Sequence, residues 1–140
     1  MSEAKCVLIV DDDPSILEVL EARLQAAGYL VRRASSGPAA LELLKKHPID
    51  ILVSDMKMPE MSGIELLAET YGIQPHLPVI FLTAYGTIPD AVDAVKAGAV
   101  DYLTKPFDGK ELVKKIRTIL SSVPESPAPP RPLAEDGGFI

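Results

Sequence analysis

Residues 7–14 read Val7-Leu8-Ile9-Val10-Asp11-Asp12-Asp13-Pro14, and this stretch decides the fold of the chain. Four consecutive apolar residues are typical of a strand that is buried on both faces of a parallel sheet. Pro14 suits the first turn of a helix. A helix is further indicated by apolar residues that recur at spacings of three and four, namely Ile16, Leu20, Leu24 and Ala27. The stretch therefore predicts a strand followed closely by a helix.

Strand-like and helix-like segments continue to alternate along the chain. Short apolar runs predict further strands at Leu30–Ala34, Ile49–Val53, Val79–Leu82 and Asp101–Thr104. Helices are predicted at Pro38–His47, from the capping-box spacing Ser62-Gly63-Ile64-Glu65 onward, from Thr87 to near Gly98, and after Asp108. Right-handed crossovers between such units place helices on both faces of one parallel sheet. The expected fold class is therefore α/β, a doubly wound five-stranded parallel sheet with five helices.

The composition is that of a globular domain. The chain has 140 residues, 47% of them hydrophobic and 24% charged, which suits one domain with a real core. Its net charge of −6 argues against direct binding of nucleic acid, because domains with that function present a basic face. No apolar run approaches the roughly 18 residues that cross a bilayer, and the N-terminus lacks a signal-peptide pattern. The single cysteine, Cys6, is expected to be a buried strand thiol, and the chain is expected to be cytoplasmic.

The composition changes after about Ser122. Residues 123–132 contain five prolines, which predict an extended, semi-rigid spacer. We therefore expect one domain over residues 1–122 and a proline-rich linker or tail over residues 123–140. A disordered tail and a linker severed from a longer protein both fit this composition.

Reactive side chains follow four of the predicted strands directly. They are Asp11 and Asp12, Asp55, Thr83 and Lys105. Because the carboxyl ends of parallel strands share one edge of the sheet, and ligands bind at that edge, these side chains should converge on one pocket.

The chemistry of this set points to phosphoryl transfer. Carboxylates forced together repel one another, and burial makes each more costly to ionise, so a cation is expected among them. Oxygen ligands without Cys or His favour Mg²⁺, with Mn²⁺ as the alternative, over zinc. The Lys105 ammonium and the Thr83 hydroxyl can bind the remaining oxygens of a phosphoryl group. The set therefore predicts phosphoryl transfer to a carboxylate with a divalent cation.

Each residue alone also has a plainer structural explanation. Asp13 immediately precedes Pro14 and is expected to cap the first helix. Asp55 could cap a turn, Thr83 could end a strand, and Lys105 could be a solvated loop residue. Their joint placement at strand ends favours the shared site.

These residues lie in longer motifs that resemble the receiver domain of two-component response regulators. The motifs are Val10-Asp11-Asp12, Asp55-Met56-Lys57-Met58-Pro59-Glu60-Met61-Ser62-Gly63, Leu82-Thr83-Ala84, and Ala97-Gly98-Ala99 through Tyr102-Leu103-Thr104-Lys105-Pro106-Phe107. The resemblance covers about residues 5–122. It implies a flavodoxin-like fold with strand order 2-1-3-4-5.

The resemblance also implies a role for each site residue. Asp55 would accept a phosphoryl group from a histidine kinase. Magnesium would be held by Asp11, Asp12, Asp55 and the backbone carbonyl of Lys57. Lys105 and Thr83 would bind the phosphoryl oxygens. Such a domain is a phosphorelay acceptor, not a conventional enzyme, and supports its own Mg²⁺-dependent phosphorylation and dephosphorylation.

Thr83 and Tyr102 match the switch pair of the same family. Phosphorylation would draw the Thr83 hydroxyl inward, and Tyr102 would follow. The implied output face runs from Thr87 to Leu120 and is also expected to serve homodimerisation. Residues 85–92 and 101–108 resemble most closely the receivers of NtrC-type transcriptional activators, which implies control of transcription through a downstream output.

Two rival functions share part of the pattern. A haloacid-dehalogenase-like phosphatase would use Asp11 as nucleophile. This alternative leaves Asp55 without a role, and such an enzyme needs a further acidic pair after Lys105, which this chain lacks. A flavodoxin-like nucleotide binder would need a first loop rich in Gly, Ser and Thr, whereas this loop carries three acids. Locating the labelled residue separates the phosphatase, labelled on Asp11, from the receiver, labelled on Asp55.

Overall fold

The computed structural model describes residues 4–58, 60–83, 95–96, 98–105 and 108–122. Its strands are β1 (Cys6–Val10), β2 (Leu30–Ala34), β3 (Ile51–Asp55), β4 (Val79–Thr83) and β5 (Asp101–Thr104). Its helices are α1 (Pro14–Ala26), α2 (Gly37–Lys46), α3 (Gly63–Ile73) and α5 (Gly109–Ser122). The predicted helix from Thr87 to near Gly98 falls largely on residues 84–94 and 97, outside the described residues, so it stays a prediction.

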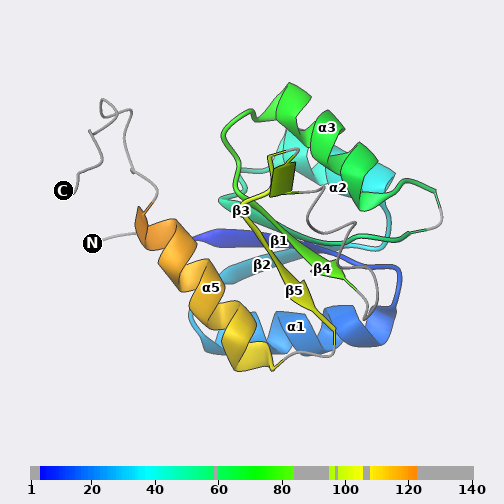
Figure 1. The fold of residues 1–140 in the computed structure, drawn as a ribbon. Coiled ribbons are helices and arrows are strands. Elements are labelled where there is room, and N and C mark those ends of the chain that lie inside the picture. Colours follow the sequence, from blue (N-terminus) through cyan, green and yellow to red (C-terminus); the bar gives the residue numbers. More distant parts are fainter. Residues whose placement is uncertain (1–3, 59, 84–94, 97, 106–107, 123–140) are drawn as a thin grey trace.

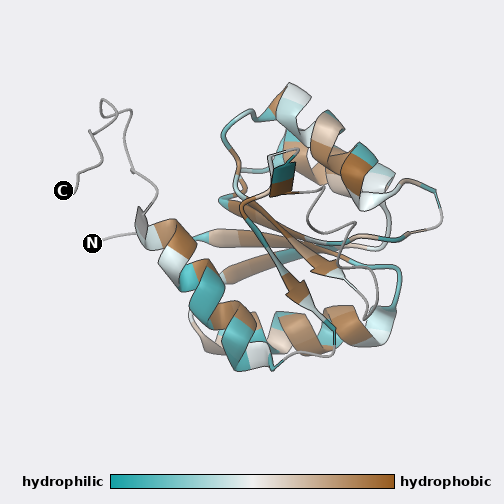
Figure 2. Ribbon diagram, viewed as in Figure 1, coloured by the Kyte–Doolittle hydropathy of each residue, from teal (hydrophilic) through white to brown (hydrophobic). Residues whose placement is uncertain are grey.

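The five strands form one parallel sheet in the order β2-β1-β3-β4-β5. Helices α2 and α3 cover one face and α1 and α5 the other (Figure 1). The strands are brown between helices whose outer faces are teal or white (Figure 2). The doubly wound α/β sheet and its strand order are therefore confirmed.

Two apolar clusters form the core, one on each face of the sheet. One joins β1, β3 and β4 to α2 and α3, with Leu8, Leu52 and Phe81 fully buried. The other joins the sheet to α1 and α5, with Leu24 and Ile116 fully buried. This double burial explains why the central strands β1, β3 and β4 consist of buried residues only.

The register of the sheet aligns the carboxyl ends of its inner strands. Val10 pairs with Ser54, Asp55 pairs with Leu82, and Thr83 pairs with Thr104. The residues that follow β1 and β5 therefore meet the last residues of β3 and β4 at one edge of the sheet.

Strand β3 starts and ends two residues later than predicted. The prediction followed the apolar run Ile49–Val53, but pairing with β4 continues through the polar residues Ser54 and Asp55. At the other end, the Asp50 carboxylate accepts a hydrogen bond of 2.7 Å from the Cys6 N–H, just before the strand begins. Backbone pairing therefore extends the end of the strand through polar residues, and a side-chain hydrogen bond precedes its start.

The buried face of α1 also differs slightly from the expectation. It consists of Leu17, Leu20 and Leu24, whereas Ile16 is only partly buried and Ala27 is the C-terminal cap. Two glycines have positive φ: Gly28, which follows α1, and Gly98, which precedes β5. The expected helix-ending role of Gly28 is confirmed.

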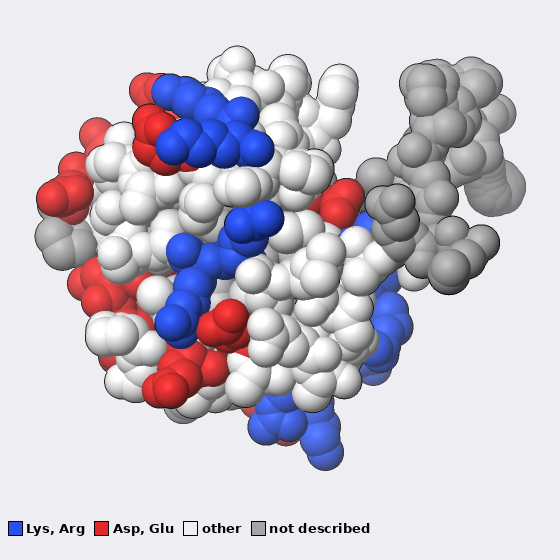
Figure 3. Space-filling view, turned by 180° about the vertical axis from the view of Figure 1, so that it is seen from behind, with Lys and Arg blue, Asp and Glu red and all other residues white. Residues whose placement is uncertain are grey.

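Charge is distributed unevenly over the surface. Seen from behind, acidic residues gather along the left side, whereas basic residues lie at the top, across the centre, at the right edge and at the bottom (Figure 3). Among the described residues, no helix has the length and apolarity to span a membrane.

Candidate functional site

Asp11 and Asp12 follow β1 directly, and the backbone fixes the first of them firmly. The Asp11 N–H donates to the Ala34 carbonyl of β2 at 3.2 Å. The Asp11 carboxylate accepts a hydrogen bond of 3.0 Å from the Asp13 N–H, and the residue is 1% exposed. Asp12, in contrast, is exposed. Asp11 is therefore rigidly held, whereas Asp12 can reach a ligand from solvent.

Asp13 caps helix α1, as predicted. Its carboxylate accepts hydrogen bonds of 2.9 Å from both the N–H and the hydroxyl of Ser15. These bonds to Ser15 lower the pKa of Asp13. This residue acts locally and belongs to the helix rather than to the acidic cluster.

Asp55 is the last residue of β3 and is 9% exposed. The Met56 N–H donates to the Leu82 carbonyl at 3.0 Å, which fixes the backbone just after the acid. The buried Ser54 hydroxyl donates to the Asp55 carbonyl at 2.9 Å. These two hydrogen bonds fix the backbone around Asp55 and so hold its carboxylate at the edge of the sheet.

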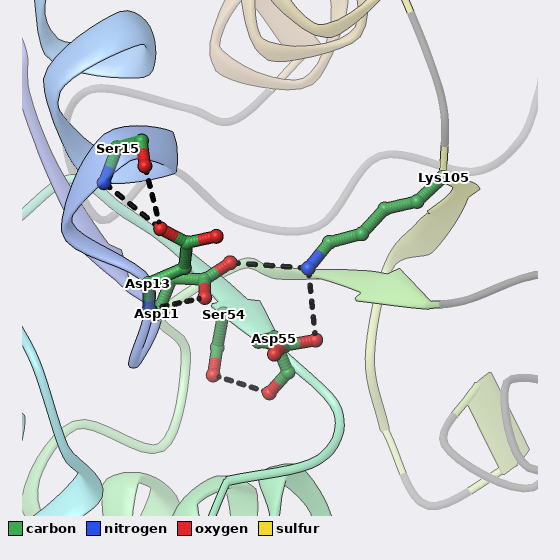
Figure 4. Close-up of polar contacts among 6 residues, drawn as sticks. All are labelled: Asp11, Asp13, Ser15, Ser54, Asp55 and Lys105. Carbon is green, nitrogen blue, oxygen red and sulfur yellow. Dashed lines mark hydrogen bonds and ion pairs between the residues drawn. The ribbon is translucent and has the colours of Figure 1, made fainter.

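Lys105 brings a positive charge between the two buried acids. Its Nζ lies 3.1 Å from Oδ2 of Asp11 and 3.4 Å from Oδ1 of Asp55 (Figure 4). The Lys105 N–H donates to the Thr83 carbonyl at 2.7 Å, so the residue is anchored to the end of β4. Burial alone would lower the pKa of Lys105, but Asp55 and Asp11 raise it above its ordinary value.

The three predicted acids form one cluster. Asp11, Asp12 and Asp55 each offer a carboxylate oxygen, and these oxygens lie within 4.8 Å of one another. Burial is the main cause that raises the pKa of Asp55; Lys105 opposes the rise, and the charges of Asp11 and Asp12 add to it. Lys105 thus compensates the cluster only in part. Crowded hard oxygen ligands of this kind suit a divalent cation such as Mg²⁺.

The other predicted site residues surround this cluster. Thr83 is the last residue of β4 and is fully buried. Tyr102 in β5 is partly buried against the core cluster on the α2 and α3 side. The Lys57 side chain is exposed two positions after Asp55. Strand ends therefore bring Asp11, Asp12, Asp55 and Lys105 together, as the sequence predicted.

Sequence reasoning missed a close backbone contact at Gly63. The Gly63 N–H donates to the Met56 carbonyl at 2.7 Å. A Cβ atom on Gly63 would lie 2.6 Å from the Phe81 ring and 2.9 Å from the Asp55 carbonyl oxygen. Helix α3 can therefore approach Asp55, at the end of β3, only because Gly63 has no side chain. The predicted capping box of Ser62 and Glu65 is present at the same helix start.

Comparisons with known proteins agree with this geometry. The family model for the response regulator receiver domain matches residues 7–117. The transcriptional regulatory protein GlrR of Escherichia coli K12 is 46% identical over 110 residues, which cover 79% of this chain and 25% of that protein. The transcriptional regulatory protein ZraR of Klebsiella oxytoca is 40% identical over 133 residues, which cover 94% of this chain and 30% of that protein. This chain thus spans only about a quarter to a third of these relatives.

Solved structures agree as well. A response regulator receiver domain protein from Clostridium thermocellum superposes with a TM-score of 0.80 at 35% identity, covering 84% of this chain and 94% of that one. The receiver domain of NtrX from Brucella abortus gives a TM-score of 0.80 at 28% identity, covering 84% and 99%. These matches do not favour the phosphatase alternative with Asp11 as nucleophile. The chain belongs to the family of response regulator receiver domains.

Proposed function

We propose that Asp55 accepts a phosphoryl group from a sensor histidine kinase, and that this modification switches the output of a longer transcriptional regulator. The observation that carries the proposal is the position of the Asp55 carboxylate. It lies at the sheet edge beside Lys105 and within 4.8 Å of the carboxylate oxygens of Asp11 and Asp12.

The transfer step requires little covalent chemistry from the protein. A carboxylate oxygen of Asp55 attacks phosphorus, and the bond from phosphorus to the donor nitrogen breaks as the acyl phosphate forms. The Lys105 ammonium, already 3.4 Å from Asp55, binds a phosphoryl oxygen and balances its charge. The buried Thr83 hydroxyl at the end of β4 is proposed to bind another. The domain acts as an acceptor in a relay and not as a conventional enzyme.

The acidic cluster fits Mg²⁺, or Mn²⁺ in its place. Burial is the main cause that raises the pKa of Asp55, and the charges of Asp11 and Asp12 add to the rise while Lys105 opposes it. Asp11, Asp12, Asp55 and the backbone carbonyl of Lys57 would hold the ion. When bound, it would supply charge compensation for the phosphoryl oxygens.

The switch and the output are proposed on the same basis. Thr83 and Tyr102 would couple the phosphoryl group to the face that runs from Thr87 to Leu120, part of which lies outside the described residues. That face includes the ion pair of Lys115 with Asp101, at 2.6 Å, and is proposed to form a homodimer. We further propose a receiver domain over residues 1–122, a linker over residues 123–140, a cytoplasmic location, and no direct contact of this domain with nucleic acid or membrane.

The test is labelling by a small phosphodonor with Mg²⁺, followed by intact-mass measurement and peptide mapping. Asp55→Asn is expected to abolish labelling while the fold, checked by circular dichroism, is retained. Asp13→Asn, which changes a neighbouring acid outside the cluster, is expected to label like the wild type. Labelling of Asp55→Asn at the wild-type rate, or acyl phosphate on Asp11, would refute the assignment.

A further inference from the structure

A basic hollow lies between α1 and α5, away from the acidic cluster. It has a volume of about 540 Å³, and four cationic side chains line it: Arg23 of α1, and Lys110, Lys114 and Arg117 of α5. All four are exposed. No carboxylate is among the described residues that line the hollow. The apolar residues Ala27 of α1 and Val113 of α5 also line it, between the cationic side chains.

These four cations have no ion-pair partner among the described residues. Some basic side chains elsewhere do form ion pairs: Arg33 with Glu21, Lys46 with Glu42, and Lys115 with Asp101. An uncompensated group of four positive charges is notable in a chain whose net charge is −6.

The placement of the cations is unfavourable for α5 itself. Lys110 lies in the first turn of the helix, where the helix dipole disfavours positive charge. Lys110 and Lys114 are four residues apart and Lys114 and Arg117 three, so like charges neighbour one another along one side of the helix. A carboxylate-bearing ligand on this row would relieve both effects.

The Arg23 side chain can lie against the start of α5 because Gly109 has no side chain there. A Cβ atom on Gly109 would lie 2.8 Å from Nε of Arg23, so the guanidinium side chain lies across the start of α5. Cationic side chains from α1 and from α5 therefore line two sides of the hollow, with apolar residues between them.

We propose that this hollow docks an acidic, amphipathic helical segment of a partner protein. Along α5, Lys110, Lys114 and Arg117 span about 10 Å of helix axis. A partner helix with glutamates at spacings of four and three matches this row, and its aliphatic side chains match the apolar residues Ala27 and Val113. Duplex DNA fits less well because the chain as a whole is acidic. A bilayer fits less well because, in the described part of the chain, the only apolar residues that line the hollow are Ala26, Ala27 and Val113.

The test measures fluorescence anisotropy of a labelled peptide of about 15 residues, with Glu at spacings of four and three and Ala or Leu between them. Saturable binding to the complete chain is expected at low salt, with weakening at about 0.3 M salt because the charges are exposed. The double variant Lys114→Glu, Arg117→Glu is expected to weaken binding by at least about tenfold. The control variant Lys45→Glu, Lys46→Glu changes two exposed lysines of α2 by the same charge and is expected to bind within about twofold of wild type.

Several results would overturn the proposal. They are equal weakening in both double variants, the same affinity for a peptide with Gln in place of Glu, and tighter binding of duplex DNA or of phosphatidylserine vesicles through the same four residues. Lys114 and Arg117 also lie within the face from Thr87 to Leu120 that is proposed to form a homodimer. Self-association of the chain that Lys114→Glu, Arg117→Glu abolishes would therefore assign the hollow to that homodimer and replace the partner protein with a second copy. None of these readouts depends on phosphorylation of Asp55.

Discussion

Replacing Asp55 by Asn should stabilise the protein against unfolding when divalent cations are removed. The site residue that a phosphoryl group is proposed to modify would then be a source of instability in the unliganded fold. The expectation follows from the charges around this buried carboxylate.

The charge interactions of Asp55 nearly cancel. At an effective dielectric constant of about 20, the Lys105 ammonium at 3.4 Å attracts the carboxylate by about 5 kcal/mol. At the same dielectric constant, Asp11, within 4.8 Å, repels it by about 3.5 kcal/mol. Exposed Asp12 adds about 1 kcal/mol of repulsion, because water screens it. The cost of burying the charge, several kcal/mol for an ion in a protein, is therefore left largely uncompensated.

Asp55→Asn removes the buried charge and keeps the side-chain shape, while Lys105 retains Asp11 as its partner. We expect the free energy of unfolding to rise by about 1 to 2 kcal/mol at pH 7 in EDTA, since the new amide must still be buried. Urea unfolding followed by circular dichroism measures this difference. Asp13→Asn is the control, because Asn caps a helix as well as Asp does, and no gain is expected from it.

The pH dependence has a definite sign. The pKa of Asp55 is raised in the folded protein, so protonation favours the folded state. The stability that protonated Asp55 contributes is present below the ordinary Asp pKa of about 4 and is lost as pH rises through the raised value. The advantage of Asp55→Asn should therefore vanish at low pH and reach its full size above the raised pKa.

Magnesium should reverse the order of the two proteins. An ion at one hundred times its dissociation constant stabilises the wild type by about 2.7 kcal/mol, and it should stabilise Asp55→Asn much less because one ligand is lost. The reasoning is refuted if Asp55→Asn is no more stable than the wild type in EDTA at pH 7, or if its advantage persists unchanged below pH 4.

Three further predictions concern packing, charge and phosphoryl lifetime. Gly63→Ala should lower the free energy of unfolding by about 2 kcal/mol or more, because its Cβ would lie 2.6 Å from a core ring and 2.9 Å from backbone; Gly72→Ala, where nothing lies within 4 Å, should instead raise it by about 0.5 to 1 kcal/mol in the same urea titration. Lys105→Gln should slow labelling by a small phosphodonor by about 100-fold or more, and labelling at the wild-type rate would exclude a role for this ammonium. Lys57 and Tyr85, two positions after Asp55 and Thr83, are proposed to screen the phosphoryl group from water; Tyr85 lies outside the described residues. Lys57→Ala and Tyr85→Ala should therefore change the dephosphorylation rate, measured by loss of the acyl phosphate. Unchanged rates in both variants would exclude that screening.

The site was predictable because its residues sit at chain positions that the sheet topology dictates. Asp11, Asp55 and Lys105 each follow or end an apolar run, and parallel pairing brings such ends to one edge. Asp13 could be separated from the cluster in advance because it precedes Pro14 and caps α1. Local sequence was sufficient for these inferences.

Other features depend on contacts that local sequence does not encode. The close approach of Gly63 to the Phe81 ring depends on how α3 packs on β4, and a glycine beside a capping serine gives no sign of it. The last residues of β3 are polar, and pairing with β1 and β4 makes them part of the strand. The basic hollow needs α1 and α5 to be adjacent, which the positions of their lysines and arginines do not reveal.

The bond between Lys105 and Asp11 joins residues 94 positions apart in the chain. During synthesis, all three acids emerge from the ribosome well before the ammonium that partly offsets them. A fragment that ends before β5 therefore carries the Asp55 carboxylate but not the Lys105 ammonium beside it. Under the proposed function, such a fragment would be a poor phosphoryl acceptor, and incomplete chains would not compete with the complete domain for phosphoryl groups.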